Sequence, residues 1–153
     1  MRAVVQRVKR AEVLVGQARI GSIESGILAL VGITPADTPS TGATLAEKIL
    51  NLRIFDDAAR RMNRSLLETG GGILCVPQFT LFGDCRKGRR PNYSAAAPPE
   101  IALPLYHSFL ESVRHLAAGA RVRVESGQFQ AMMQVQLVND GPVTLLLDTD
   151  KVF

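Results

Sequence analysis

The stretch GGILCVPQFTL, residues 71–81, joins an apolar run to two polar side chains and then enters a basic loop. The uninterrupted apolar run is typical of a strand that is covered on both faces. Gln78 and Thr80 alternate with Phe79, so on an extended strand they face the same side. Either a neighbouring loop or a bound substrate can satisfy two such polar groups. We therefore predict a buried strand that ends at a candidate site.

Further strand patterns lie on both sides of this stretch. Residues 26–34, GILALVGIT, form a second nearly continuous apolar run, which again suits a strand covered on both faces. The N-terminal residues 2–15 are rich in β-formers and partly alternate, and Gly16 and Gly21 indicate a hairpin after them. Three more strands are expected near the C-terminus, at about 120–126, 130–138 and 143–149. The turn signal NDGP separates the last two of them.

Two segments carry the signals of helices. ADTPST, residues 36–41, has the composition of a helix start, with Pro39 near the first turn. Residues 98–119 have helical spacing of apolar residues and end at Gly119, and Pro104 is expected to delay or kink the first turn. Two main helices among about seven strands, without a repeat or linker, predict one compact α/β domain over residues 1–153. We expect mixed β-sheets in a three-layer arrangement.

Composition points to a folded chain in a reducing compartment. Hydrophobic residues make up 46% and charged residues 21%, so a disordered chain is excluded. Cys75 and Cys85 form no CxxC motif, and Cys75 has the apolar neighbours of a core residue. No apolar run approaches the roughly 18 residues that a membrane-spanning helix needs, and the N-terminus lacks the apolar stretch of a secretion signal. We expect a cytoplasmic protein with no membrane partner.

Positive charge is concentrated in one loop. The formal net charge is only +4, a modest bias towards anionic partners. Arg86, Lys87, Arg89 and Arg90, however, lie within five positions, directly after the predicted strand end and close to Tyr93. Such a charge run is usually a solvated loop, but basic side chains beside an aromatic ring also suit the end of a nucleic acid.

Conventional catalytic and metal motifs are scarce. His107, Glu111 and His115 have a spacing that resembles metal-ligand spacing, yet positions eight apart on a helix lie about 12 Å apart along its axis. An apolar stripe is expected on the other face of that helix, formed by Ile101, Leu105, Phe109, Val113 and Leu116. We therefore interpret the two histidines and the glutamate as a solvated face and expect no metal. No serine-hydrolase elbow, phosphate-binding loop or zinc pattern is present.

Four motifs together resemble the D-aminoacyl-tRNA deacylase family. They are VVQRV (4–8), PQFTL (77–81), RRPNYS (89–94) and MQVQLVNDGPVT (133–144). Each motif alone is weak, but the ordered set runs almost from end to end of the chain. The resemblance implies a homodimer, without metal or cofactor, that hydrolyses the ester between a D-amino acid and the terminal adenosine of tRNA. It also implies removal of glycine mischarged on tRNA-Ala.

The resemblance assigns chiral selection to the last motif. In this family the Gly–Pro bond, here Gly141–Pro142, is cis, and the pair reaches into the active site of the other subunit. Its carbonyls capture the amino group of the substrate and leave no room for an L side chain. Arg7 matches the arginine that steadies the motif, and Met133 is assigned to the same substrate-binding set. From turn chemistry alone, NDGPVT would instead fit a hairpin turn.

The remaining motifs are expected to bind the ester and the RNA. The resemblance places Gln78, Phe79 and Thr80 around the ester as the catalytic residues. An aminoacyl ester is already activated, and the tRNA's own 2′-hydroxyl lies beside it, so the protein needs mainly to orient the ester and stabilise an oxyanion. Thr80 as a nucleophile would need a general base, and the sequence offers no candidate. The tRNA-binding residues are predicted to be Arg86, Lys87, Arg89, Arg90 and Tyr93.

Two alternative functions remain at the level of sequence. The family usually has serine where this chain has Pro77, and a paralogous branch with Pro-Gln-Ala-Thr and a trans Gly–Pro bond removes L-alanine from threonine tRNA. Phe79 and the NDGPVT context favour the D-specific family. A nucleic-acid-binding module without chemistry, as in relatives linked to replication origins, fits the basic loop but leaves the other motifs unexplained.

Overall fold

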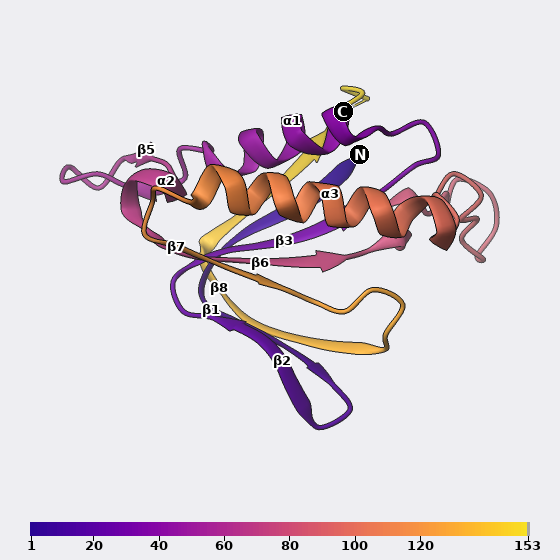
Figure 1. The fold of residues 1–153 in the computed structure, drawn as a ribbon, viewed down its shortest axis with the longest axis horizontal. Coiled ribbons are helices and arrows are strands. Elements are labelled where there is room, and N and C mark those ends of the chain that lie inside the picture. Colours follow the sequence, from indigo (N-terminus) through magenta and orange to yellow (C-terminus); the bar gives the residue numbers. More distant parts are fainter. Residues whose placement is uncertain (153) are drawn as a thin grey trace.

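The computed structural model describes residues 1–152 and contains a six-stranded mixed sheet with two long helices on one face (Figure 1). The elements follow one another as β1 (Arg2–Val15), β2 (Ala18–Ile23), β3 (Gly26–Gly32), α1 (Pro39–Leu50), β4 (Phe55–Asp56), β5 (Met62–Arg64), α2 (Leu66–Thr69), β6 (Gly71–Pro77), the 3-10 helix η1 (Phe79–Phe82), α3 (Pro99–Ala117), β7 (Val122–Ser126) and β8 (Met133–Asp148). None of the helices within residues 1–152 is long and apolar enough to span a membrane.

The sheet has the strand order β2-β1-β3-β6-β7, and β8 pairs with β1. β1 runs antiparallel to β2, β3 and β8, whereas β3 pairs in parallel with β6 and β6 in parallel with β7. Residues 2–6 of β1 pair with both β3 and β8, so β8 lies along the opposite edge of β1. The prediction of one α/β domain with a mixed sheet is confirmed.

Two cores lie on the two faces of the central strands, which gives the predicted three layers. On β3, Ile27 and Ala29 face the core beneath α1 and α3, while Leu28 faces the second core. β6 divides in the same way, with Cys75 towards the helices and Leu74 away from them, as expected for strands with a period of two. Figure 1 shows α1 and α3 on one side and β2 with the adjoining half of β8 on the other.

Glycines allow the parallel strands β3 and β6 to approach closely at their beginnings. Gly26 pairs with Gly72, and a Cβ on Gly26 would overlap the carbonyl of Gly72. Gly71 has φ +109°, and a Cβ there would come 2.4 Å from the carbonyl oxygen of Ser25, which accepts a hydrogen bond from Gly72 N. Both apolar runs begin with glycine because any side chain here would push the two strands apart.

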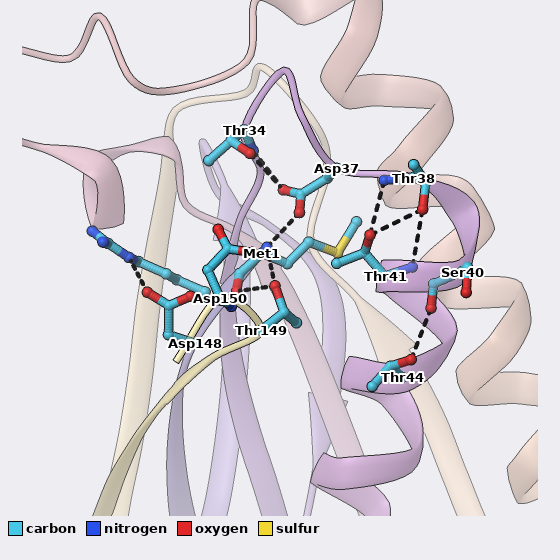
Figure 2. A network of polar contacts seen from close by, with 11 residues as sticks. Met1, Thr34, Asp37, Thr38, Ser40, Thr41, Thr44, Asp148, Thr149 and Asp150 are labelled. Carbon is cyan, nitrogen blue, oxygen red and sulfur yellow. Dashed lines mark hydrogen bonds and ion pairs between the residues drawn. The ribbon is translucent and has the colours of Figure 1, made fainter. Parts of the chain in front are cut away.

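The connection from β3 to α1 is held by a buried polar network (Figure 2). Asp37 accepts hydrogen bonds from the backbone N–H of Thr34 at 2.7 Å and from its hydroxyl at 3.1 Å. The same carboxylate pairs with the amino group of Met1 at 2.5 Å, and that amino group also donates to the hydroxyl of Thr149 at 2.6 Å. Thr38 then caps the N-terminus of α1. The chain that leaves β3 is therefore fixed in place.

The strand that was predicted over 71–81 is shorter than expected. β6 ends at Pro77, and the following residues turn into η1, so the expectation that Gln78 and Thr80 share one side of a strand is wrong. Pro77 has no N–H to continue the ladder. The N–H of Gln78 donates to the carbonyl of Val31 at 2.7 Å, and the chain then turns away from the sheet.

The NDGP segment does not reverse the chain, so the expected hairpin turn is wrong. β8 continues through both predicted C-terminal strands and pairs with β1 on either side of the motif, with Val8 opposite Asn139 and Gln6 opposite Thr144. The residues between bulge outwards opposite Arg7. The Asn139 side chain bridges the base of this bulge by donating to the carbonyls of Arg7 at 2.9 Å and Val143 at 3.0 Å.

The buried face of α3 is rotated relative to the predicted stripe. Phe109 and Val113 are buried as expected, but Ile101 and Leu116 are 39% and 36% exposed. The residues buried instead are Ala102, Tyr106, Leu110 and Ala117. Tyr106 belongs to the core because its hydroxyl has a buried partner, the carbonyl of Cys75 at 2.9 Å. Pro104 lies inside the helix, which starts five residues earlier at Pro99, so it does not delay the first turn.

The two cysteines should differ sharply in reactivity. Cys75 is fully buried on β6, and burial raises the pKa of its thiol to about 12, whereas Cys85 is exposed. A thiolate-selective reagent at mildly alkaline pH should therefore label one thiol in the native chain and both after unfolding, because only the thiolate reacts. The variant Cys85→Ser should show no rapid native labelling. Rapid labelling of that variant would contradict the buried position of Cys75.

Candidate functional site

A cavity of about 700 Å³ lies where the carboxyl ends of β3 and β6 meet the N-terminus of α3 and the start of β8. Parallel strands bring their carboxyl ends to one edge of a sheet, and ligands commonly bind there. The segment after each parallel strand contributes to the walls: Ile33 after β3, Gln78 and Phe79 after β6, and residues 129–133 after β7. A cavity of this volume can hold a small-molecule ligand or a nucleoside.

Two aromatic rings stand at the rim of the cavity. Phe79 is 58% exposed and Tyr93 is 39% exposed, and their rings meet edge to face with centroids 5.2 Å apart. Tyr93 packs directly on the backbone at Gly83, where a Cβ would lie 2.9 Å from the Tyr93 ring. The lack of a side chain at Gly83 therefore keeps Tyr93 beside Phe79. Exposed ring faces of this kind can stack on a nucleobase.

The first turn of η1 presents two free backbone donors. The N–H of Gln78 donates to the carbonyl of Val31. Within the turn, the first N–H that forms a hydrogen bond is that of Leu81, which donates to the carbonyl of Gln78 at 3.3 Å. Within residues 1–152 the N–H groups of Phe79 and Thr80 have no acceptor, as expected at a helix start. The Gln78 side-chain amide donates to the Thr80 hydroxyl at 2.5 Å. Two adjacent N–H groups at a cavity mouth can stabilise a negatively charged oxygen.

The described residues that line the cavity include few titratable groups. Among the described residues that line the cavity, Tyr93 is the one titratable side chain, and histidine, carboxylate and lysine side chains are missing. The hydroxyl of Thr80 has an amide as its partner rather than a base. In the part of the chain that the structure describes, no group of three or more histidine, cysteine, aspartate or glutamate side chains could hold a metal ion. The described walls therefore supply hydrogen-bonding groups and shape.

The Gly141–Pro142 pair protrudes from the edge of β8. Its peptide bond is cis, both residues are exposed, and Gly141 has φ +120°. Arg7 supports the bulge from behind: its guanidinium donates to the carbonyl of Asp140 at 3.3 Å and to that of Ile54 at 2.6 Å. It also pairs with the carboxylate of Asp140 at 3.3 Å. The side chain of Arg7 is only 11% exposed, so its guanidinium is held in place and stabilises the bulge.

Within one chain this bulge and the cavity are separate. Arg7 pairs with Ile27 near the start of β3, whereas the cavity begins at Val31, about 13 Å further along the strand. Met133 lines the cavity at the first residue of β8, eight positions before Gly141. Of the predicted site residues, the structure brings Gln78, Phe79, Tyr93 and Met133 to one cavity. Thr80 adjoins them, and Arg7, Gly141 and Pro142 lie elsewhere.

The predicted RNA-binding cations lie on an exposed loop that starts and ends next to the cavity. Asp84 and Asn92 close the loop by two backbone hydrogen bonds of 2.7 and 2.9 Å. Arg86 binds the Asp84 carboxylate through two side-chain hydrogen bonds, and these hold the pKa of that carboxyl well below its usual range. The cations left without a carboxylate partner, within residues 1–152, are Lys87, Arg89 and Arg90. The loop therefore offers three free positive charges rather than four.

Two wall segments were missed by the sequence analysis. One is the chain before α3, where the N–H of Ala97 donates to Ile33 O at 2.8 Å and so fixes the rim. The other is the β7–β8 loop, in which Gln130 has φ +58° and Met132 is 90% exposed. Small and apolar residues carry no motif. These two segments could have been predicted only from their position, because a segment that follows a parallel strand lies at the edge of the sheet where ligands bind.

Comparison with known proteins gives one consistent result. A family model described as D-Tyr-tRNA(Tyr) deacylase matches residues 4–148. A D-aminoacyl-tRNA deacylase of Desulforudis audaxviator (strain MP104C) is 58% identical over 153 residues, covering 100% of each chain. One of Thermus aquaticus is 55% identical over 151 residues, 99% of this chain and 97% of that protein. The solved structure of a c-Myc DNA Unwinding Element Binding Protein has a TM-score of 0.88 at 42% identity, covering 97% of this chain and 98% of that one.

These matches confirm the resemblance that the four motifs indicated. They extend over nearly the whole chain, and they are far too similar in sequence to reflect the fold alone. A tRNA substrate follows from the family. The chain therefore belongs to the D-Tyr-tRNA(Tyr) deacylase family and is a hydrolase that acts on D-aminoacyl-tRNA.

Proposed function

We propose that the cavity at the carboxyl ends of β3 and β6 binds the terminal adenosine of D-aminoacyl-tRNA and hydrolyses its ester by positioning and oxyanion stabilisation. The observation that carries this proposal is the pair of free N–H groups of Phe79 and Thr80 beside walls that lack an acid–base group. Covalent catalysis by Thr80 would need a base, and its hydroxyl meets only the Gln78 amide.

The proposed chemistry uses groups of the substrate as well as of the protein. Attack of water on the ester carbonyl places negative charge on the carbonyl oxygen, and the N–H groups of Phe79 and Thr80 stabilise that charge. The tRNA's free 2′-hydroxyl lies next to the ester and assists, so the protein needs no general base of its own. Phe79 and Tyr93 offer exposed ring faces for the adenine, and Lys87, Arg89 and Arg90 contact phosphates.

Chiral selection, in this proposal, depends on a second copy of the chain. The Gly141–Pro142 bulge is exposed and cannot line the cavity of its own chain, so it enters the cavity of the partner in a homodimer. There its carbonyls bind the substrate's amino group and leave no room for an L side chain. Glycine has no side chain to reject, so glycine mischarged on tRNA-Ala is also removed.

The outer edge of β8 supports the homodimer. Among the described residues β8 pairs only with β1, so its other edge presents unpaired backbone groups. Leu146 on this strand is 61% exposed and Val138 is 36% exposed. A long, partly apolar edge strand favours association with another chain, and identical copies usually associate with two-fold symmetry.

Two other activities have specific support. Pro77 matches the branch that removes L-alanine from threonine tRNA, and the similarity to a c-Myc DNA Unwinding Element Binding Protein fits binding without turnover. The D-specific reading is favoured by Phe79. Release of amino acid from D-Tyr-tRNA, L-Tyr-tRNA, Gly-tRNA-Ala and L-Ala-tRNA-Thr under one condition separates the three functions.

The oxyanion proposal predicts opposite results for two neighbouring residues. Thr80→Ala keeps the backbone N–H and should retain kcat within about tenfold, whereas Phe79→Pro removes one N–H and should lower kcat by about 100-fold or more. Phe79→Ala is the matched control, because it removes the ring but keeps the N–H. Single-turnover hydrolysis of D-Tyr-tRNA measures all three. If Thr80→Ala is folded but inactive, the positioning mechanism is wrong.

The Gly141 proposal predicts a loss of deacylation on adding one methyl group. A Cβ at Gly141 would lie 2.8 Å from Val143 Cγ2 and 3.1 Å from Arg7 Nη2, so Gly141→Ala should displace the motif. We expect kcat/KM on D-Tyr-tRNA to fall by about 100-fold. Gly16→Ala is the matched control, since Gly16 also has positive φ but open space around it. Unchanged rates with Gly141→Ala would refute the assigned role.

A further inference from the structure

A second cavity adjoins the first and shares one wall with it. It has a volume of about 430 Å³ and lies between α3 and the segment that follows β7. Phe129 lines both cavities, and its ring also packs against Tyr106 with centroids 6.2 Å apart. The two cavities therefore adjoin at Phe129, and the second is the neighbouring place for a further group of a ligand that fills the first.

Polar side chains without partners face this second cavity. His107, Glu111 and Arg114 are spaced four and three residues apart, so they occupy one face of α3. Within residues 1–152 none of these side chains forms a hydrogen bond or ion pair. Glu111 and Arg114 do not pair, although their spacing of three residues makes them neighbours on the helix surface. The side chain of Gln128, on the opposite wall, is likewise unpaired among the described residues. Both donors and acceptors are therefore free for a ligand.

The mixture of charges defines the ligand class. The Glu111 carboxylate would repel a phosphate, so a phosphate site is excluded. The Arg114 guanidinium would repel a metal cation, so a metal site is excluded as well. His115, the third member of the metal-like spacing, lines a different groove between α1 and α3. The edge of cytosine combines an amino donor with two acceptors, so it matches a carboxylate beside a guanidinium and an amide. The ring of Phe129 adds a surface for base packing.

We propose that this second cavity is the subsite for the cytidine that precedes the terminal adenosine of tRNA. Glu111 accepts from the cytosine amino group, and Arg114 and Gln128 donate to its ring nitrogen and carbonyl. The proposal rests on the function proposed above, in which the adenosine occupies the first cavity. Because every tRNA ends in CCA, a cytidine subsite can bind any charged tRNA. The aminoacyl group is then bound in the first cavity.

The first test compares a whole tRNA with a fragment that lacks the cytidine. Glu111→Ala and Arg114→Ala should each lower kcat/KM on D-Tyr-tRNA by about tenfold, the discrimination typical of one base-edge contact, and leave hydrolysis of D-tyrosyl-adenosine unchanged. Glu24→Ala and Arg121→Ala make the same chemical changes at exposed positions outside both cavities and should have no effect. Equal losses on tRNA and fragment would overturn the proposal.

The second test changes the base itself. D-tyrosylated tRNA ending in CCA or CUA can be made by ligating an acylated dinucleotide to a shortened tRNA. Uracil has an acceptor where cytosine has its amino donor, so the native chain should prefer CCA by about tenfold. Glu111→Gln should remove that preference, because an amide can both donate and accept. Equal rates for the two ends with the native chain would overturn the proposal.

The two tests separate this proposal from the one on which it rests. Failure of the native chain to hydrolyse the fragment would contradict the assignment of the first cavity, while the CCA and CUA comparison still decides the cytidine subsite. In the competing arrangement, the basic loop rather than the second cavity receives the cytidine, and the phosphates contacted by Lys87, Arg89 and Arg90 are those next to it. If reversal of Lys87, Arg89 and Arg90 to glutamate removes the CCA preference and Glu111→Gln does not, the cytidine subsite is wrong.

Discussion

The close parallel pairing of β3 with β6 determines where the cavity of the proposed active site lies. Gly26 lets β3 approach the backbone of Gly72 without a side chain between them, and β7 continues the parallel set. The carboxyl ends of all three strands then open at one edge, where the segments that follow them enclose the cavity. Helices α1 and α3 cover one face and the β2 region covers the other, so this edge remains the open end of the central layer (Figure 1).

In the proposed mechanism, this arrangement would let a hydrolase function with few catalytic side chains. The strand end at Pro77 forces a turn whose first N–H groups have no acceptor within residues 1–152, and such donors are fixed before the substrate arrives. An activated ester with its own neighbouring hydroxyl then needs little more than orientation. The chiral selection proposed for Gly141–Pro142 follows the same logic, because a main-chain motif held by Arg7 would reject a side chain by its shape alone.

The sequence allowed the α/β fold and the buried strands to be predicted, because apolar runs are local signals. The ordered motifs also singled out Gln78, Phe79, Tyr93 and Met133, which the structure brings to one cavity. The errors arose where a distant partner determines local structure. Asn139 converts a strong turn signal into a bulge by bridging two carbonyls, and the carbonyl of Cys75 draws Tyr106 into the core. No pattern along the chain encodes these two contacts. Asp84, in contrast, precedes Arg86 by two residues, so their pairing could have been predicted from the sequence.

The central claim is that an active site combines the cavity of one chain with the Gly141–Pro142 bulge of another. Mixing Phe79→Pro and Gly141→Ala chains, each inactive alone, tests it most directly. After subunit exchange, about half of the dimers are mixed and each has one site with both parts intact, so about a quarter of native activity on D-Tyr-tRNA should return. A mixture that stays inactive while native mass spectrometry detects the mixed dimer would contradict the claim.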